Sequence, residues 1–112
     1  MRHGEVWLVN LDTTIGKEII KTRPAVIMSS NSIGALPLRL IVPLTPWKEH
    51  YGLAPWMLKI EPSPENGLSK PSAADCLQIH SVPNKRLARK LGKLTPEEME
   101  QIAAHIQLVI RD

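Results

Sequence analysis

The chain has 112 residues and a mass of 12.5 kDa, which is the length of one domain and leaves no room for a second hydrophobic core. Hydrophobic residues make up 43% and charged residues 22%, a globular composition that excludes a disordered tail protein. No run reaches the roughly 18 apolar residues of a membrane-spanning helix, and no signal-peptide pattern opens the sequence. The single cysteine, Cys76, excludes an internal disulfide, so we expect a cytoplasmic protein.

Basic and acidic residues are unevenly distributed. Residues 1–94 contain 13 basic and 7 acidic side chains, a net charge of +6, whereas residues 95–112 contain one basic and four acidic side chains, a net charge of −3. A basic body with an acidic C-terminal piece is typical of a protein that binds a polyanion on one face. On charge alone, nucleic-acid binding and ordinary surface solubility both stay open.

Short apolar runs separated by prolines and glycines predict strands in the first two thirds of the chain. The predicted strands cover residues 5–11, 24–29, 39–44, 56–60 and 73–79. Residues 61–72 are turn material, and the Asn66-Gly67 pair within them favours a hairpin. Strands of this length and spacing predict a mainly β fold, a small curled antiparallel barrel.

The C-terminal segment has the period of a helix. Thr95 is the predicted N-cap, Pro96 the first helical residue and Glu98 the capping-box partner. The apolar residues that follow share one helical face, at Met99, Ile102, Ala103, Ile106, Val109 and Ile110. We therefore expect a helix over residues 96–111 that closes one side of a barrel formed by residues 1–94.

Residues 85–94 allow two interpretations. They contain five basic residues and no acidic one, with leucines at helical spacing, although Gly92 argues against a long helix. The segment is either a solvated rim with leucines beneath it or a patch that faces phosphates.

Most familiar catalytic motifs are absent. The sequence contains no phosphate-binding glycine loop, no zinc-protease helix motif and no cysteine–histidine metal spacing, and its four histidines are dispersed. Cys76 falls in an apolar predicted strand, where a thiol is unreactive. A hydrolase built on this chain would have to work without a metal and without a histidine pair.

Two stretches stand out as candidates for chemistry. In residues 16–27 a polar loop leads to Arg23, and Pro24 biases the backbone of Arg23 toward an extended shape. A guanidinium held at a strand entrance suits phosphate, because its forked donors match phosphate oxygens. In residues 42–47, Thr45 places a hydroxyl at a strand end, two residues before Trp47.

The order and spacing of seven short segments make the chain similar to the MazF/PemK family of toxin endoribonucleases. The segments are Gly4-Glu5-Val6-Trp7-Leu8-Val9, Gly16-x-Glu18…Thr22-Arg23-Pro24-Ala25-Val26, Ser29-Ser30-Asn31, Val42-Pro43-Leu44-Thr45, Asn66-Gly67-Leu68…Ser72, Asp75-x-x-Gln78-Ile79 and Leu91-Gly92-Lys93-Leu94.

The resemblance implies one domain over residues 1–112, an SH3-like barrel with a C-terminal α-helix. It further implies a homodimer that cleaves single-stranded RNA without metal or cofactor, and a partner antitoxin whose flexible C-terminal tail occupies the RNA groove. Carried over by motif, the catalytic residues are Arg23 and Thr45.

Chemistry suggests a role for each catalytic residue. In metal-free RNA cleavage the substrate's own 2′-hydroxyl attacks the adjacent phosphorus and expels the 5′-oxygen, which leaves a 2′,3′-cyclic phosphate and a 5′-hydroxyl. Arg23 would stabilise the developing charge, and the Thr45 hydroxyl would hold a phosphate oxygen. Because arginine gives up its proton so reluctantly, Glu18 is our candidate for the base or for orienting Arg23.

The remaining candidates would contact RNA. Gln78 could read a base, Trp47 could stack on one or pack beneath a loop, and Lys21 and Thr22 lie beside the catalytic arginine. Where the family commonly has a basic residue two positions after this glutamine, the chain has His80, which makes that phosphate contact pH-dependent or removes it.

Two other functions use the same barrel. Gyrase-directed toxins resemble distant relatives of this fold and act without cutting RNA, and a non-catalytic RNA-binding module would bind RNA without cleavage. Retention of Arg23 and Thr45 in their motifs favours the ribonuclease. Apolar residues in expected loops (Ile19, Ile20 and Leu53) are the hint of dimerisation in the sequence.

Overall fold

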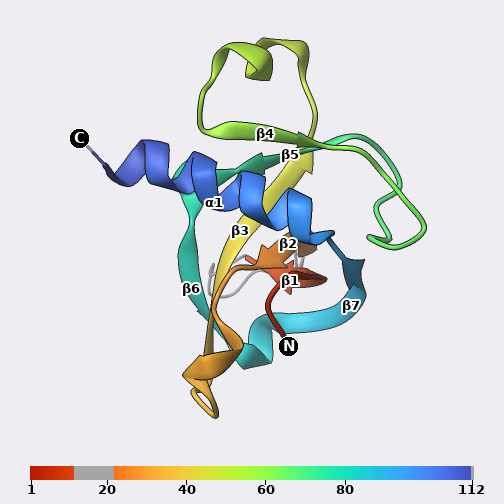
Figure 1. Ribbon diagram of the computed structural model, residues 1–112. Coiled ribbons are helices and arrows are strands. Elements are labelled where there is room, and N and C mark those ends of the chain that lie inside the picture. The colour runs from red at the N-terminus through yellow and green to blue at the C-terminus, as the bar shows by residue number, and fades with distance from the viewer. Residues whose placement is uncertain (12–21, 112) are drawn as a thin grey trace, which may run out of the picture.

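The computed structural model describes residues 1–11 and 22–111, which form a strongly curved antiparallel sheet crossed by one C-terminal helix (Figure 1). The strands are β1 (Glu5–Asn10), β2 (Thr22–Ile27), β3 (Leu38–Pro46), β4 (Met57–Ile60), β5 (Ser72–Asp75), β6 (His80–Pro83) and β7 (Leu87–Lys93). The helix α1 covers Pro96–Ile110, and 3₁₀ turns cover η1 (Asn31–Ile33), η2 (Glu49–Leu53), η3 (Cys76–Gln78) and η4 (Asn84–Arg86). The predicted mainly β fold with a C-terminal helix is confirmed.

The long strand β3 joins the two halves of the sheet. The strands follow the order β4-β5-β3-β2-β1-β7, and β6 pairs with the first part of β3. One edge of β3 pairs with β2, while its other edge pairs first with β6 and then with β5. Every pairing is antiparallel, as expected for short strands joined by turns.

The predicted barrel is not closed by strand pairing among the described residues, and a loop bridges its open side. The described strands β4 and β7 lie at the two ends of the strand order and do not pair with each other. The loop between β4 and β5 bridges them, because the backbone N–H of Lys93 donates to the carbonyl of Glu65 at 2.9 Å. Gly67 and Gly92 allow this approach: a Cβ on Gly67 would collide with the Leu91 carbonyl, and one on Gly92 with the Glu65 carbonyl.

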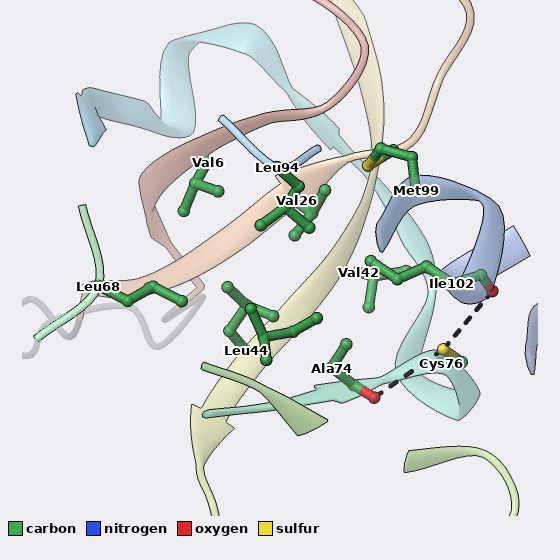
Figure 2. Close-up of a cluster of buried hydrophobic side chains, with 11 residues drawn as sticks. Val6, Val26, Val42, Leu44, Leu68, Ala74, Cys76, Leu94, Met99 and Ile102 are labelled. Carbon is green, nitrogen blue, oxygen red and sulfur yellow. Dashed lines mark hydrogen bonds between the residues drawn. The ribbon is translucent and has the colours of Figure 1, made fainter. Parts of the chain in front are cut away.

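Hydrophobic side chains pack on both faces of the sheet. On one face, Met99 and Ile102 of α1 are buried against Val42 and Cys76, as Figure 2 shows. On the other face a second cluster is formed by Val9, Ala25, Ile27, Ile41, Val82 and Leu87. The predicted capping box of α1 is confirmed: Thr95 accepts from the Glu98 N–H at 3.1 Å, and Glu98 accepts from the Thr95 N–H at 2.9 Å.

The predicted strand over residues 73–79 is wrong in its second half. The strand β5 ends at Asp75, the turn η3 follows, and β6 begins at His80. Between Ala74 and His80 the chain advances six residues, whereas their partners on β3, Leu44 and Ile41, are three residues apart. The turn takes up the difference, so Cys76 lies in η3 and not in a strand.

Most of residues 85–94, for which the sequence left a solvated rim and a phosphate-facing patch open, form the strand β7. The strand pairs with β1 through two register shifts, which leave Ala88 and Leu91 without an opposite residue. These bulges give the leucines a spacing that imitates a helical stripe.

The Asn66-Gly67 pair does not form a two-residue hairpin turn. It lies inside the 11-residue loop that joins β4 to β5, where Gly67 has a φ of 70°. Within the described ranges, no helix has the length and apolar character needed to cross a membrane.

Candidate functional site

A cavity of about 680 Å³ opens where the pairing of β2 and β3 ends. Its polar lining residues come from β2, β3, β7 and the β4–β5 loop with the start of β5: Thr22, Arg23, Thr45, Ser69, Lys70, Ser72 and Arg89. Its apolar lining residues are Leu8, Pro24, Leu44, Pro46, Gly67, Leu68 and Leu91.

The register of β2 and β3 explains why Arg23 and Thr45 meet at this cavity. The pairing of the two strands ends at Ala25 opposite Pro43. Two residues further along each strand, the same register brings Arg23 level with Thr45. Proline has no N–H to donate to a ladder, and Pro24 and Pro43 stand where the pairing stops. The pairing between the two strands therefore ends here, and Arg23 and Thr45 both line the cavity beyond it.

Another row of residues runs beneath the cavity across three strands. Leu8 of β1 pairs with Pro24 of β2 on one side and with Arg89 of β7 on the other. Directly opposed residues of antiparallel strands point to the same face. Arg89 consequently faces the cavity from β7, which is three places from β3 in the strand order.

The loop that forms the remaining wall is organised by one buried amide. Asn66 is 1% exposed, and its Oδ1 accepts from the Ser63 and Leu68 N–H groups at 3.0 and 2.9 Å. Its Nδ2 donates to the Glu61 carbonyl at 2.9 Å. These bonds fix the path of the loop just before Ser69 and Lys70 enter the lining.

The described lining carries positive charge and no carboxylate. Its cations are Arg23, Lys70 and Arg89. Both ion pairs in the described part of the chain involve Glu5, with Lys90 and with the amino terminus, so these three cations have no described carboxylate partner. Together with the hydroxyls of Thr22, Thr45 and Ser69, the lining suits a phosphate-bearing anion.

Three of the predicted site residues are brought together and the others are not. Arg23, Thr45 and Thr22 line the cavity. Glu18 and Lys21 lie outside the described residues.

Gln78, His80 and Trp47 are absent from the described lining of this cavity. Gln78 and His80 are exposed neighbours, and the Nδ1 of the His80 ring lies 2.7 Å from the Gln78 carbonyl oxygen. Trp47 is half-buried, in edge contact with Tyr51 at 5.8 Å, and Lys59 Nζ lies 5.3 Å from the centre of its ring. Its surroundings are those of a packed loop aromatic.

Sequence reasoning missed Ser69 and Lys70 as site residues, because they fell in a segment interpreted only as a turn. Arg89 was one of five basic residues in an ambiguous segment. The β-bulges of β7 that set the direction of Arg89 apart from that of the other basic residues cannot be recognised in the sequence.

Glu5 is the one strongly perturbed carboxylate in the described residues. Burial raises the pKa of Glu5, but hydrogen bonds from the Arg2 N–H, the Trp7 indole, Lys90 and the amino terminus outweigh it and lower that pKa to about 2. Lys90 Nζ lies 3.0 Å from Glu5 Oε2. Lys90 is thereby engaged with Glu5, while the adjacent Arg89 faces the cavity.

The Cys76 thiol is shielded, as predicted. It is fully buried, and burial, followed by the nearby Asp75 carboxylate, raises its pKa to about 11. Its Sγ lies 3.9 Å from the carbonyl oxygens of Ala74 and Ile102 (Figure 2). The thiol therefore takes no part in the site.

Comparison with known sequences finds a family and a characterised relative. Residues 2–110 match the model of the PemK-like, MazF-like toxins of type II toxin–antitoxin systems. The chain is 31% identical over 114 residues to endoribonuclease MazF9 of Mycobacterium tuberculosis, an alignment that covers 96% of this chain and 94% of that protein.

Solved structures share the fold. MazE–MazF from Deinococcus radiodurans (Form-II) superposes with a TM-score of 0.79 at 18% identity, over 98% of this chain and 95% of that chain. An endoribonuclease in complex with its cognate antitoxin from a mycobacterial species gives a TM-score of 0.76 at 20% identity, over 98% and 94% of the two chains.

Proposed function

We propose that this chain, which belongs to the PemK-like, MazF-like toxins of type II toxin–antitoxin systems, cuts single-stranded RNA in the cavity between β2, β3 and β7. The chain is an endoribonuclease of that family. The observation that supports this cavity as the active site is that Arg23 and Thr45 line it together, just beyond the last residue pair of β2 and β3.

The chemistry that fits these two side chains is a transesterification, in which the substrate's own 2′-hydroxyl attacks the adjacent phosphodiester. The 2′-oxygen forms a bond to phosphorus as it loses its proton, and the bond to the 5′-oxygen breaks as that oxygen gains one. The products are a 2′,3′-cyclic phosphate and a 5′-hydroxyl. No water is consumed in this step.

Arg23 and Thr45 have distinct roles in this proposal. The Arg23 guanidinium stabilises the charge that builds on the phosphate oxygens and can protonate the leaving oxygen. The Thr45 hydroxyl donates to a phosphate oxygen and holds the phosphorus in line for attack. Glu18 is proposed as the base or as the group that orients Arg23, and it lies outside the described residues.

Other predicted residues would contact the RNA away from the phosphate that is cleaved. We propose that Thr22 and Lys21 contact the phosphate backbone beside Arg23. Gln78 and His80, exposed at the junction of η3 and β6, are proposed as contacts for RNA that extends beyond the cavity. Trp47 stays a predicted stacking residue, although Tyr51 and Lys59 already contact its ring.

The proposed protein partner is an antitoxin with a flexible tail. Acidic side chains on such a tail would be attracted to the three lining cations that attract RNA. One structurally similar endoribonuclease was solved with its cognate antitoxin. We also propose a cytoplasmic location, where the RNA substrate is found.

A homodimer is the proposed assembly. Leu53, which the sequence suggested as an interface residue, is 90% exposed, while Ile19 and Ile20 lie outside the described residues. Exposed leucines also follow one another on and before β3, at Leu36, Leu38 and Leu40. Burial of such residues against a second copy would remove apolar area from water. Gel filtration at micromolar concentration tests this, and elution as a monomer contradicts it.

Cleavage of a long mixed-sequence RNA in EDTA tests the proposed function. We expect discrete fragments that carry 2′,3′-cyclic phosphate and 5′-hydroxyl ends, and their loss in Arg23→Ala. Arg111→Ala removes a guanidinium that is not part of the cavity lining and should cut as the wild type does. Circular dichroism confirms that both variants fold.

Other outcomes point to the other functions. RNA that is bound but left intact by the wild type indicates a non-catalytic RNA-binding module. Intact RNA together with binding to gyrase indicates a gyrase poison. Equal cleavage by wild type and Arg23→Ala contradicts the proposed active site.

A further inference from the structure

We infer that Arg89 is a second phosphate-binding residue of the site, which holds an RNA phosphate next to the one that reacts between Arg23 and Thr45. This inference rests on the proposed function. It assigns Arg89 to positioning the substrate and not to the chemical step.

A β-bulge aims Arg89 at the cavity. Leu87 pairs with Val9 and Arg89 pairs with Leu8, so Ala88 between them has no opposite residue on β1. In a regular strand Leu87 and Arg89 would point to the same face. The extra residue instead leaves Leu87 buried with Val9 in the second cluster and turns Arg89 toward the face of Leu8 and Pro24.

The nearby basic residues Lys90 and Lys93 are not in the lining of this cavity. Lys90 pairs with Trp7 in the register and contacts Glu5 at 3.0 Å. Lys93 lies beside a separate hollow formed with His3 and Met99. Of the five basic residues between 85 and 93, Arg89 is the one in the cavity lining.

The charge of Arg89 is available to a ligand. Its side chain is exposed and has no described carboxylate partner. Its forked donors match phosphate oxygens. An exposed guanidinium in a concave site attracts anions and raises their local concentration.

The spacing suits a strand of RNA laid across the cavity. Leu8 stands between Arg89 and Pro24, so the backbones of β7 and β2 are about 10 Å apart, or two strand spacings. Arg23 adjoins Pro24 on the β2 side. Arg23 and Arg89 line the same cavity, so two arginines at this separation can hold consecutive phosphates of one strand.

The test uses mixed-sequence 2′-O-methyl RNA, which binds but lacks the attacking hydroxyl. We expect Arg89→Gln to weaken binding about fivefold at low salt, as for loss of one charge-assisted phosphate contact. The slope of log affinity against log salt should fall by about 0.7, the value for one phosphate of a single strand. Arg89→Lys should keep the slope, because it keeps the charge.

Cleavage kinetics on unmodified RNA give a second readout. Loss of Arg89 should raise KM and leave kcat unchanged, since the reacting phosphate stays with Arg23 and Thr45. Lys93→Gln is the matched control, because it removes an exposed cation from the same strand outside the cavity. Equal effects of Arg89→Gln and Lys93→Gln on the salt slope overturn the inference. Failure of the wild type to bind or cut RNA overturns the proposed function itself.

Discussion

Glu65 and Lys93 are joined by a backbone hydrogen bond of 2.9 Å that ties the β4–β5 loop to β7. The same loop supplies Ser69 and Lys70 to the cavity, and β7 supplies Arg89. This contact therefore links the bridging of the open sheet to the assembly of the cationic wall. Changes that push the loop off β7 should affect both stability and RNA binding.

Substitution of Gly92 tests this dependence. A Cβ at Gly92 would collide with the Glu65 carbonyl, which is backbone and yields little. We expect Gly92→Ala to lower the free energy of unfolding by about 2 kcal/mol, the usual cost of overpacking, and to weaken RNA binding as the loop shifts. Urea unfolding and RNA titration measure the two effects. Gly52→Ala is the control, because a Cβ there meets nothing within 4 Å. Equal stability of the two variants would show that the loop accommodates the methyl group.

Glu5 should control the acid stability of the fold. Its folded pKa of about 2 lies below the ordinary value of 4.5, so the ionised form is favoured in the folded state. The stability that it contributes is complete above the unfolded pKa and is lost as pH falls from 4.5 toward 2.

The change Glu5→Gln removes this linkage. At pH 7 we expect it to lower the free energy of unfolding by about 2 kcal/mol, since it also leaves Lys90 without its partner. The difference from the wild type should shrink between pH 4.5 and pH 2. Urea denaturation across that range measures it, with the exposed Glu61→Gln as control. A constant difference at all pH values would contradict the perturbed carboxylate.

Features encoded by local chemistry were predictable from the sequence. The Thr95, Pro96 and Glu98 pattern marks the start of α1, because a cap is satisfied by residues within one turn. Arg23 and Thr45 were recognised from their motifs. The structure adds the reason they face one cavity, which is the register of β2 and β3 beside two prolines.

Features set by pairing between distant segments were not predictable. The break after Asp75 exists because β5 and β6 pair with β3 in different registers. The bulges of β7 depend on its pairing with β1, so the leucine spacing alone resembled a helix. For the same reason the cavity lining from Ser69, Lys70 and Arg89 could be found only once the loop and strand were placed together.

The rate of RNA cleavage should depend on the hydroxyl of Thr45 more than on the volume of its side chain. Thr45→Val keeps the volume of the side chain and removes the donor, so we expect kcat for RNA cleavage to fall about 100-fold or more, as for loss of one donor to a transition-state oxygen. Thr45→Ser keeps the hydroxyl and should retain most activity. Single-turnover cleavage of one RNA measures the rates. Equal rates for Thr45→Val and the wild type would remove Thr45 from the mechanism.

The Cys76 thiol should report on global unfolding. It is fully buried between η3 and α1, and its pKa of about 11 keeps it protonated at neutral pH. Since only the thiolate reacts readily, a thiol reagent at pH 8 should modify the native protein at the rate at which the core opens, and the unfolded protein in urea at once. An exposed thiol on β6, Ser81→Cys in a Cys76→Ala background, is the control and should react promptly in the native state. Modification of native Cys76 as fast as that control would place the thiol at the surface and contradict the packing of α1 on the sheet.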